Sequence, residues 1–164
     1  MTSKTINRNP AINTSYKLEI PGFDSLNYFV QSTEIPSLSS GGVETAYQNW
    51  GTNVPSNRIE FDPLNVNFLV SEDLMNYQSL YEWMIQITMT EPVVPEMMKN
   101  IVLHITNSSR NHKMQIRFHK AYPTMLGSIP FDSGVNDVNP LLCSATFRYQ
   151  YFEIIRDASG RTSS

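Results

Sequence analysis

The three histidines and the single cysteine are the residues whose chemistry would suit a metal site or a nucleophile. His104, His112 and His119 show no spacing typical of a zinc site, and one cysteine leaves a structural zinc site short of ligands. We therefore expect polar histidines on sheet faces. Cys143 follows two leucines into an apolar strand, which favours a buried, inert thiol over a nucleophile paired with a histidine.

The acidic residues also have structural explanations. Asp132 and Asp137 flank Gly134 in a segment with too few acidic ligands for a calcium loop, so we expect a turn bonded to its own backbone. The sequence contains no Gly-rich phosphate loop, no Gly-x-Ser-x-Gly and no His-Glu-x-x-His. We therefore expect no catalytic, cofactor-binding or metal-binding residue and no enzymatic activity. The non-structural alternative is a small hydrolase that uses His119 or Asp132.

Composition narrows the class of protein. The chain has 164 residues, of which 40% are hydrophobic and 16% charged, and a net charge of −3. This length fits one domain, and the low charged fraction suits a surface that is buried against other subunits. The negative charge argues against a dedicated nucleic-acid binder. No run of apolar residues is long enough for a transmembrane helix, and the polar N-terminus does not resemble a secretory signal.

The elements predict an α+β fold dominated by antiparallel sheet, sandwich- or barrel-like, with about seven strands and one main helix on the sheet. We expect a flexible N-terminal arm over 1–14, a β domain over 15–155 and a polar tail over 156–164. Later strands are expected over 101–106, 114–122 and 141–155, with a turn at 107–111. Phe147, Tyr149 and Tyr151 would share one face of the last strand.

The first half of the β domain predicts a strand over 15–20, with Tyr16, Leu18 and Ile20 on one face, and a hairpin partner over 28–33. A strand over 64–70 would place Leu64, Val66, Phe68 and Val70 inward. Ser71, Glu72 and Asp73 are typical of a helix start. The helix over 74–89 would bury a stripe that contains Leu74, Tyr77, Leu80, Tyr81, Met84, Ile85 and Thr88. Trp83 lies off this stripe, at its margin or against a neighbouring molecule.

Residues 35–57 show no sustained periodicity. A loop of this length inside a compact domain is usually functional or disordered. Tyr47 and Trp50 are large apolar residues that gain from being covered. We therefore expect the loop to dock on another surface.

The order of these elements resembles the tail tube proteins of contractile-tailed bacteriophages. Four segments carry the resemblance: 32–36 (Ser-Thr-Glu-Ile-Pro), 66–83 from the strand into the helix, 121–133, and 145–152 in the closing strand. The resemblance implies hexameric rings whose sheets join into one barrel around a channel. The rings would stack into an inner tube, assembled in the host cytoplasm, that contacts sheath, baseplate and terminator proteins. Genome DNA would pass through without sequence-specific binding, and related rings occur in type VI secretion.

The same resemblance assigns candidate site residues. The loop over 35–57 would reach the adjoining ring, with Tyr47, Trp50 and Val54 as contacts and Trp83 as a further interface residue. Polar side chains expected to face the channel are Asn65, Asn67, Gln115, Arg117, Arg148 and Gln150. Basic residues among them, with His119, would slow phosphate transit unless Glu19, Glu60 and Glu153 offset them or they face the sheath.

The leading hypothesis is a repeating subunit of the tail tube, a structural virion protein that conducts DNA. Baseplate initiators in the family that this chain resembles often carry added domains, and 164 residues leave little room for one. The alternatives are a ring at one end of the tube, a baseplate initiator or a terminator, and a tube protein of a type VI secretion-like system.

Overall fold

The structure is a computed structural model that describes residues 16–47, 50–92, 95–106, 112–134 and 139–156. Within these ranges it does not describe the side chains of 43–47, 50–53, 56, 112 and 113. The expected N-terminal arm, the turn at 107–111, Asp137 and the tail beyond Arg156 lie outside the described residues.

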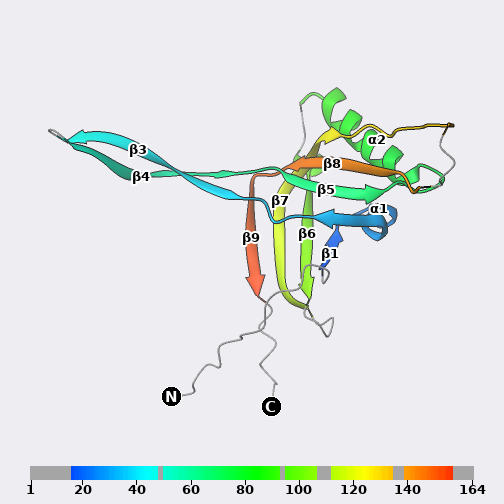
Figure 1. The fold of residues 1–164 in the computed structure, drawn as a ribbon, viewed down its shortest axis with the longest axis horizontal. Helices are drawn as coiled ribbons and strands as arrows, with labels where there is room; N and C mark the ends of the chain where they lie inside the picture. Colours follow the sequence, from blue (N-terminus) through cyan, green and yellow to red (C-terminus); the bar gives the residue numbers. More distant parts are fainter. Residues whose placement is uncertain (1–15, 48–49, 93–94, 107–111, 135–138, 157–164) are drawn as a thin grey trace, which may run out of the picture.

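The described residues form nine strands, two α-helices and one short 3₁₀ helix (Figure 1). In chain order they are β1 (Tyr16–Glu19), α1 (Asp24–Phe29), β2 (Val30–Thr33), β3 (Leu38–Tyr47), β4 (Trp50–Phe61), β5 (Leu64–Leu69), α2 (Met75–Met89), η1 (Pro95–Met97), β6 (Lys99–Thr106), β7 (His112–Leu126), β8 (Leu142–Arg148) and β9 (Tyr151–Arg156). The predicted antiparallel β-rich fold with one main helix is confirmed.

Seven strands form one sheet, in the order β1-β6-β7-β8-β5-β2, with β9 paired to β7. All of these pairs are antiparallel. The long strand β7 joins two parts of the sheet: its first half pairs with β6 and β9, and its second half pairs with β8. We call β1-β6-β7-β9 the lower sheet and β2-β5-β8 the upper sheet, as they lie in Figure 1.

The core lies between these two parts of the sheet and under the helices. The alternation in β5 is confirmed, because Leu64, Val66 and Phe68 are fully buried. The lower sheet contributes Leu18, Ile101, Leu103, Ile116 and Phe118, and β8 contributes Cys143, Ala145 and Phe147. Strand periodicity therefore identified the inward side chains of β5 and Leu18 of β1.

The expected hairpin between the first two strands is wrong. Gly22 turns the chain with φ +83° after β1, but residues 24–29 form α1, and β2 pairs with β5. Asn27 of α1 fixes this arrangement, because its side chain accepts a 2.8 Å hydrogen bond from the Ile20 amide and donates a 3.1 Å bond to the Ile20 carbonyl. The two strands consequently lie at opposite ends of the sheet order.

The irregular loop expected over 35–57 is instead a long β-hairpin. Strands β3 and β4 pair from Leu38–Phe61 to Tyr47–Trp50 and form a two-stranded sheet of their own. The register shifts between Ser40 and Gly42, opposite a longer stretch of β4 after Pro55. This bulge breaks the period-two pattern, which explains why the sequence showed no strand periodicity. We call this hairpin the arm.

Helix α2 begins differently from the prediction. Leu74 is the N-cap, with φ 57° and no capping side chain, while the Asp73 carboxylate accepts a 3.2 Å hydrogen bond from the Met75 amide. Ser71 bonds the buried Asn76 instead: its amide donates to Asn76 Oδ1 at 3.1 Å, and Asn76 Nδ2 donates to the Leu69 carbonyl at 2.7 Å. The buried Asn76 side chain therefore stabilises the start of the helix by hydrogen bonds to the backbone that precedes it.

The buried side of α2 is also rotated from the predicted stripe. Asn76, Leu80 and Trp83 are buried, whereas Tyr81 and Ile85 are 53% and 37% exposed. Trp83 packs on Phe23 and Phe147, with ring centroids 5.1 and 6.0 Å away, and its indole N–H donates to the Met97 carbonyl at 2.8 Å. Trp83 is thus a core residue of the protomer. It is not exposed on the surface, where a residue that contacts another subunit would lie.

The closing strand expected over 141–155 is two strands. The ladder of β8 ends at Arg148 and β9 starts at Tyr151, so the alternation does not continue across Tyr149 and Gln150. Phe147 is buried but Tyr151 is 46% exposed, so the two do not share one face as predicted, and Phe152 packs against the core instead.

Candidate assembly surfaces

The arm projects far from the body of the molecule, where its two strands pair mainly with each other (Figure 1). Three apolar side chains along it are about half exposed: Leu38, Val54 and Ile59. A two-stranded hairpin is marginally stable alone in water, and apolar side chains on it gain from being covered. The arm therefore has the features of a segment that another molecule covers.

The root of the arm is fixed to the body. Phe61 packs against Tyr149 and Phe152, with ring centroids 6.1 and 5.4 Å away. The Asp62 amide donates to the Ser37 carbonyl at 3.2 Å, and the Ser37 hydroxyl also donates to the Asp62 carboxylate. These contacts set the direction in which the arm leaves the body.

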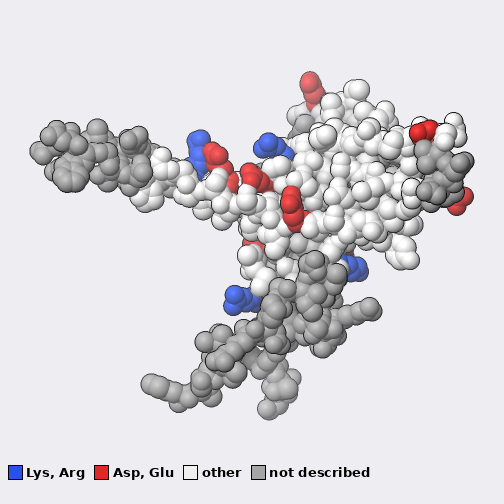
Figure 2. Space-filling view, viewed as in Figure 1, with Lys and Arg blue, Asp and Glu red and all other residues white. Residues whose placement is uncertain are grey.

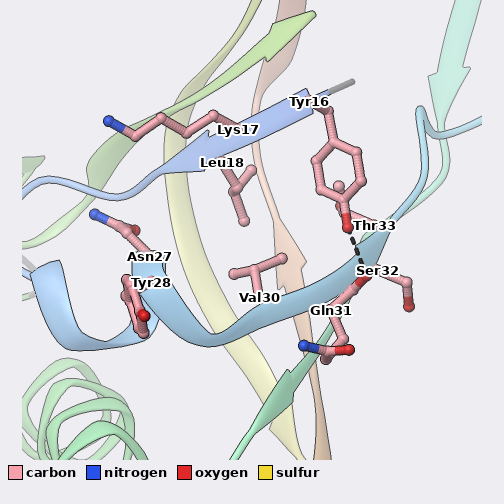
Figure 3. A pocket seen from close by; sticks show the side chains of 9 residues that line it. All are labelled: Tyr16, Lys17, Leu18, Asn27, Tyr28, Val30, Gln31, Ser32 and Thr33. Carbon is pink, nitrogen blue, oxygen red and sulfur yellow. Dashed lines mark hydrogen bonds between the residues drawn. The ribbon is translucent and has the colours of Figure 1, made fainter. Parts of the chain in front are cut away.

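The two ends of the sheet, β1 and β2, lie side by side without forming a ladder (Figure 3). The Tyr16 hydroxyl bridges them by donating a 2.6 Å hydrogen bond to the Gln31 carbonyl. Between them is an open groove of about 600 Å³, into which Leu18 and Val30 point. One side-chain hydrogen bond therefore bridges the two ends of the sheet. Each of these two strands keeps one edge without a strand partner in the described residues.

The outer face of the lower sheet carries ionisable side chains. His104 Nε2 lies 3.1 Å from the Glu19 carboxylate. Glu153 lies between two residues of β7, at 2.9 Å from His119 Nε2 and 3.7 Å from Arg117. Glu153 thus lies beside Arg117 and His119, two of the basic groups that we expected it to offset, whereas Glu19 lies beside His104.

The outer face of the upper sheet carries mostly neutral hydroxyl and amide side chains. In one row, Asn67 pairs with Ser32 and Ser144, and Asn67 Nδ2 donates to Ser32 Oγ at 2.9 Å. In the next, the Thr146 hydroxyl donates to Asn65 Oδ1 at 3.1 Å. This surface was missed beyond its two asparagines, although the alternation of Ser144 and Thr146 with inward residues was visible in the sequence.

The residues weighed for catalysis have structural surroundings. Cys143 is buried, and burial raises the pKa of its thiol, as expected for an inert cysteine. The Asp132 carboxylate accepts a 2.8 Å hydrogen bond from the Gly134 amide, which confirms that half of the expected turn. Among the described residues, no three His, Cys, Asp or Glu side chains are grouped as metal ligands, and no helix is long and apolar enough to cross a membrane.

The structure distributes the candidate site residues over distinct surfaces. Tyr47 and Trp50 are paired at the outer end of the arm, and Val54 lies farther back on β4. Asn65 and Asn67 belong to the outer face of the upper sheet, with Arg148 at the end of β8.

Gln115 and Arg117 belong to the outer face of the lower sheet. Gln150 lies between β8 and β9, where its amide donates to the His119 carbonyl at 3.0 Å.

Comparison with known proteins identifies the family. Residues 4–155 match the family model described as phage tail tube protein. The tail tube terminator protein of Enterobacteria phage T4 is 30% identical over 161 residues, which cover 91% of each chain.

Solved structures agree on the fold. The sheath/tube terminator of an extracellular contractile injection system (PVC) superposes with a TM-score of 0.66 at 16% identity, over 92% of this chain and 99% of that chain. The tube-terminating cap of the anti-feeding prophage gives 0.65 at 16% identity, over 94% and 96%. Hcp1 from Flavobacterium johnsoniae gives 0.54 at 16% identity, over 85% and 94%. The chain therefore belongs to the phage tail tube protein family, as its resemblance indicated, and is a component of the virion tail.

Proposed function

We propose that this protein is a terminator: a non-enzymatic structural subunit whose ring closes the end of the tail tube of a contractile phage. The observation that carries the proposal is the 30% identity to the T4 tail tube terminator across 91% of both chains. The sequence alone favoured the repeating tube subunit, with the tube-end ring as an alternative. The similarity to a terminator instead favours the tube-end ring over the repeating subunit.

The surfaces of the protomer support a ring. Strands β1 and β2 each have an edge without a strand partner in the described residues, and exposed edges favour pairing with another chain. Closure of neighbouring sheets into a barrel removes such edges. We infer a homohexamer around a channel through which genome DNA passes, with the arm reaching the adjoining ring and with tube and sheath components as partners.

Electron microscopy of the purified protein distinguishes the two roles. A terminator forms single or paired rings that do not grow with concentration, because its free face does not accept another copy. A repeating subunit forms tubes whose length increases with concentration, since a head-to-tail interface propagates. Long tubes of the pure protein would contradict the terminator role, and persistent monomers would contradict both roles.

A second measurement tests the non-enzymatic role. His119→Ala removes the histidine that lies 2.9 Å from Glu153, and we expect this variant to form rings as the wild type does. Phage particles carrying it should retain infectivity. Normal rings with abolished infectivity would contradict a purely structural role.

A further inference from the structure

The outer faces of the two parts of the sheet differ in charge. On the lower sheet, Lys17, Glu19, Arg117 and Glu153 carry charge, and His104 and His119 lie among them. On the upper sheet, the central row of Ser32, Asn67 and Ser144 is neutral. Charge on the upper face is confined to its margins in the described residues: Glu34 beside Asn65, and Arg148 at the end of β8.

Figure 2 shows one side of the molecule, on which a broad uncharged area covers the part of the body where β2, β5 and β8 lie, while charged side chains lie around the root of the arm and at the periphery. The body therefore presents one extended area with little fixed charge.

The polar groups of the upper face are already engaged with one another. Asn65 donates to Glu34 at 2.8 Å and accepts from Thr146 at 3.1 Å, while Asn67 donates to Ser32 at 2.9 Å. The Gly127 amide donates to the Ser144 carbonyl at 2.7 Å, and a Cβ at Gly127 would lie 2.6 Å from Ser144 Oγ. The backbone at Gly127 therefore packs closely against β8. Several side-chain donors of this face already have hydrogen-bond partners within the protomer.

Such a surface suits the passage of a polyanion. Duplex DNA carries about one charge per 1.7 Å, and cationic side chains bind it by releasing counterions. In a ring of six, every lysine or arginine on the channel wall is present six times. A wall of mutually bonded serine, threonine and asparagine offers neither this attraction nor many free donors to phosphate.

We propose that the outer face of β2, β5 and β8 lines the channel and lets duplex DNA slide without binding. This proposal rests on the proposed function, because it requires a ring. It assigns Asn65 and Asn67 to the channel wall with Ser32, Ser144 and Thr146. It removes Gln115 and Arg117 from the wall, because the charged face of the lower sheet turns toward surrounding components.

Lysine substitutions test the assignment. Asn67→Lys and Ser32→Lys each place six cations on the proposed wall, at positions whose paired neighbours are neutral. Gln115→Lys is the matched control, since it makes the same charge change on the outer face of β7. Preformed rings of each variant are mixed at low salt with one plasmid in two forms, linearised and covalently closed circular, and binding is measured by mobility shift.

Topology separates channel binding from surface binding, because only the linear form can thread a closed ring. For Asn67→Lys and Ser32→Lys we expect affinity for linear DNA to exceed that for circular DNA about tenfold or more, and to fall steeply with salt as six phosphate contacts predict. For Gln115→Lys rings we expect no preference for the linear form.

Two results would overturn the assignment. One is equal binding of both DNA forms by the Asn67→Lys and Ser32→Lys rings; the other is a preference for linear DNA that arises only with Gln115→Lys. Failure of the wild-type protein to form rings is a different result, because it contradicts the proposed function itself.

Discussion

The Tyr149 hydroxyl donates a 2.6 Å hydrogen bond to the backbone carbonyl of Asp62. This bond joins the break between β8 and β9 to the residue that follows the arm. With the packing of Phe61 on the Tyr149 ring, it connects the direction of the arm to the body of the protomer. A fixed root of this kind is what the proposed contact of the arm with an adjoining ring would require.

Tyr149 gives the protein a pH-dependent contribution to stability. Burial, followed by the Asp62 charge, raises the pKa of Tyr149 from 10.0 to about 12. Because the folded pKa lies above the ordinary value, the contribution is present below pH 10 and is lost as the pH rises through about 12. We expect Tyr149→Phe to lower the free energy of unfolding by roughly 1 kcal/mol at neutral pH.

Urea unfolding at about pH 8 and about pH 11 checks this prediction. The wild-type free energy of unfolding should fall more between these pH values than that of Tyr149→Phe, which lacks only the Tyr149 hydroxyl. Equal falls in the two proteins would show that Tyr149 makes no such contribution.

Trp83 should behave as a core residue. Trp83→Ala removes its packing on Phe23 and Phe147 and the hydrogen bond to Met97, and buried tryptophan truncations cost about 3–5 kcal/mol. Tyr81→Ala, on the exposed side of α2, should change stability by no more than about 0.5 kcal/mol. Chemical denaturation of both variants measures the difference, and a larger loss for Tyr81→Ala would place the wrong side of the helix in the core.

Asn76 should stabilise the junction between β5 and α2. Asn76→Ala leaves the Leu69 carbonyl and the Ser71 amide without this partner, and unmade buried hydrogen bonds cost about 1–3 kcal/mol. Gln78→Ala is the control, because its bond to Glu82 is exposed on the same helix. Thermal unfolding should show a clear loss for the first variant and little change for the second. Equal melting temperatures would contradict the role of Asn76.

Val54 tests the arm. Val54→Asp adds a charge to a half-exposed apolar position of β4, and we expect the protomer to unfold as the wild type does. If the arm is buried in the assembly, binding to preformed tail tubes should weaken about tenfold or more, since burying a valine contributes about 1.5–3 kcal/mol. Asn57→Asp makes a similar charge change at another exposed position of the same strand. Co-sedimentation with tubes compares them, and equal binding would exclude Val54 from the contact.

The sequence by itself determined the features that depend on near neighbours. Alternation placed Leu64, Val66 and Phe68 inward, because successive side chains of a strand point to opposite sides. Spacings of three and four residues identified the helix that forms α2, and the order of the segments indicated the family. Each of these signals arises from residues that are close together in the chain, so it can be recognised from the sequence alone.

Only the tertiary structure decided what depends on distant partners. Helix α2 has apolar residues on several sides, so its sequence did not reveal that Trp83 and not Tyr81 is buried; packing against Phe23 and Phe147 selects that side. Strand β2 has no local signal for its partner, because the ladder to β5 joins residues more than thirty positions apart. The division of polar residues between a charged and a neutral face likewise follows from strand order, which long-range pairing alone establishes.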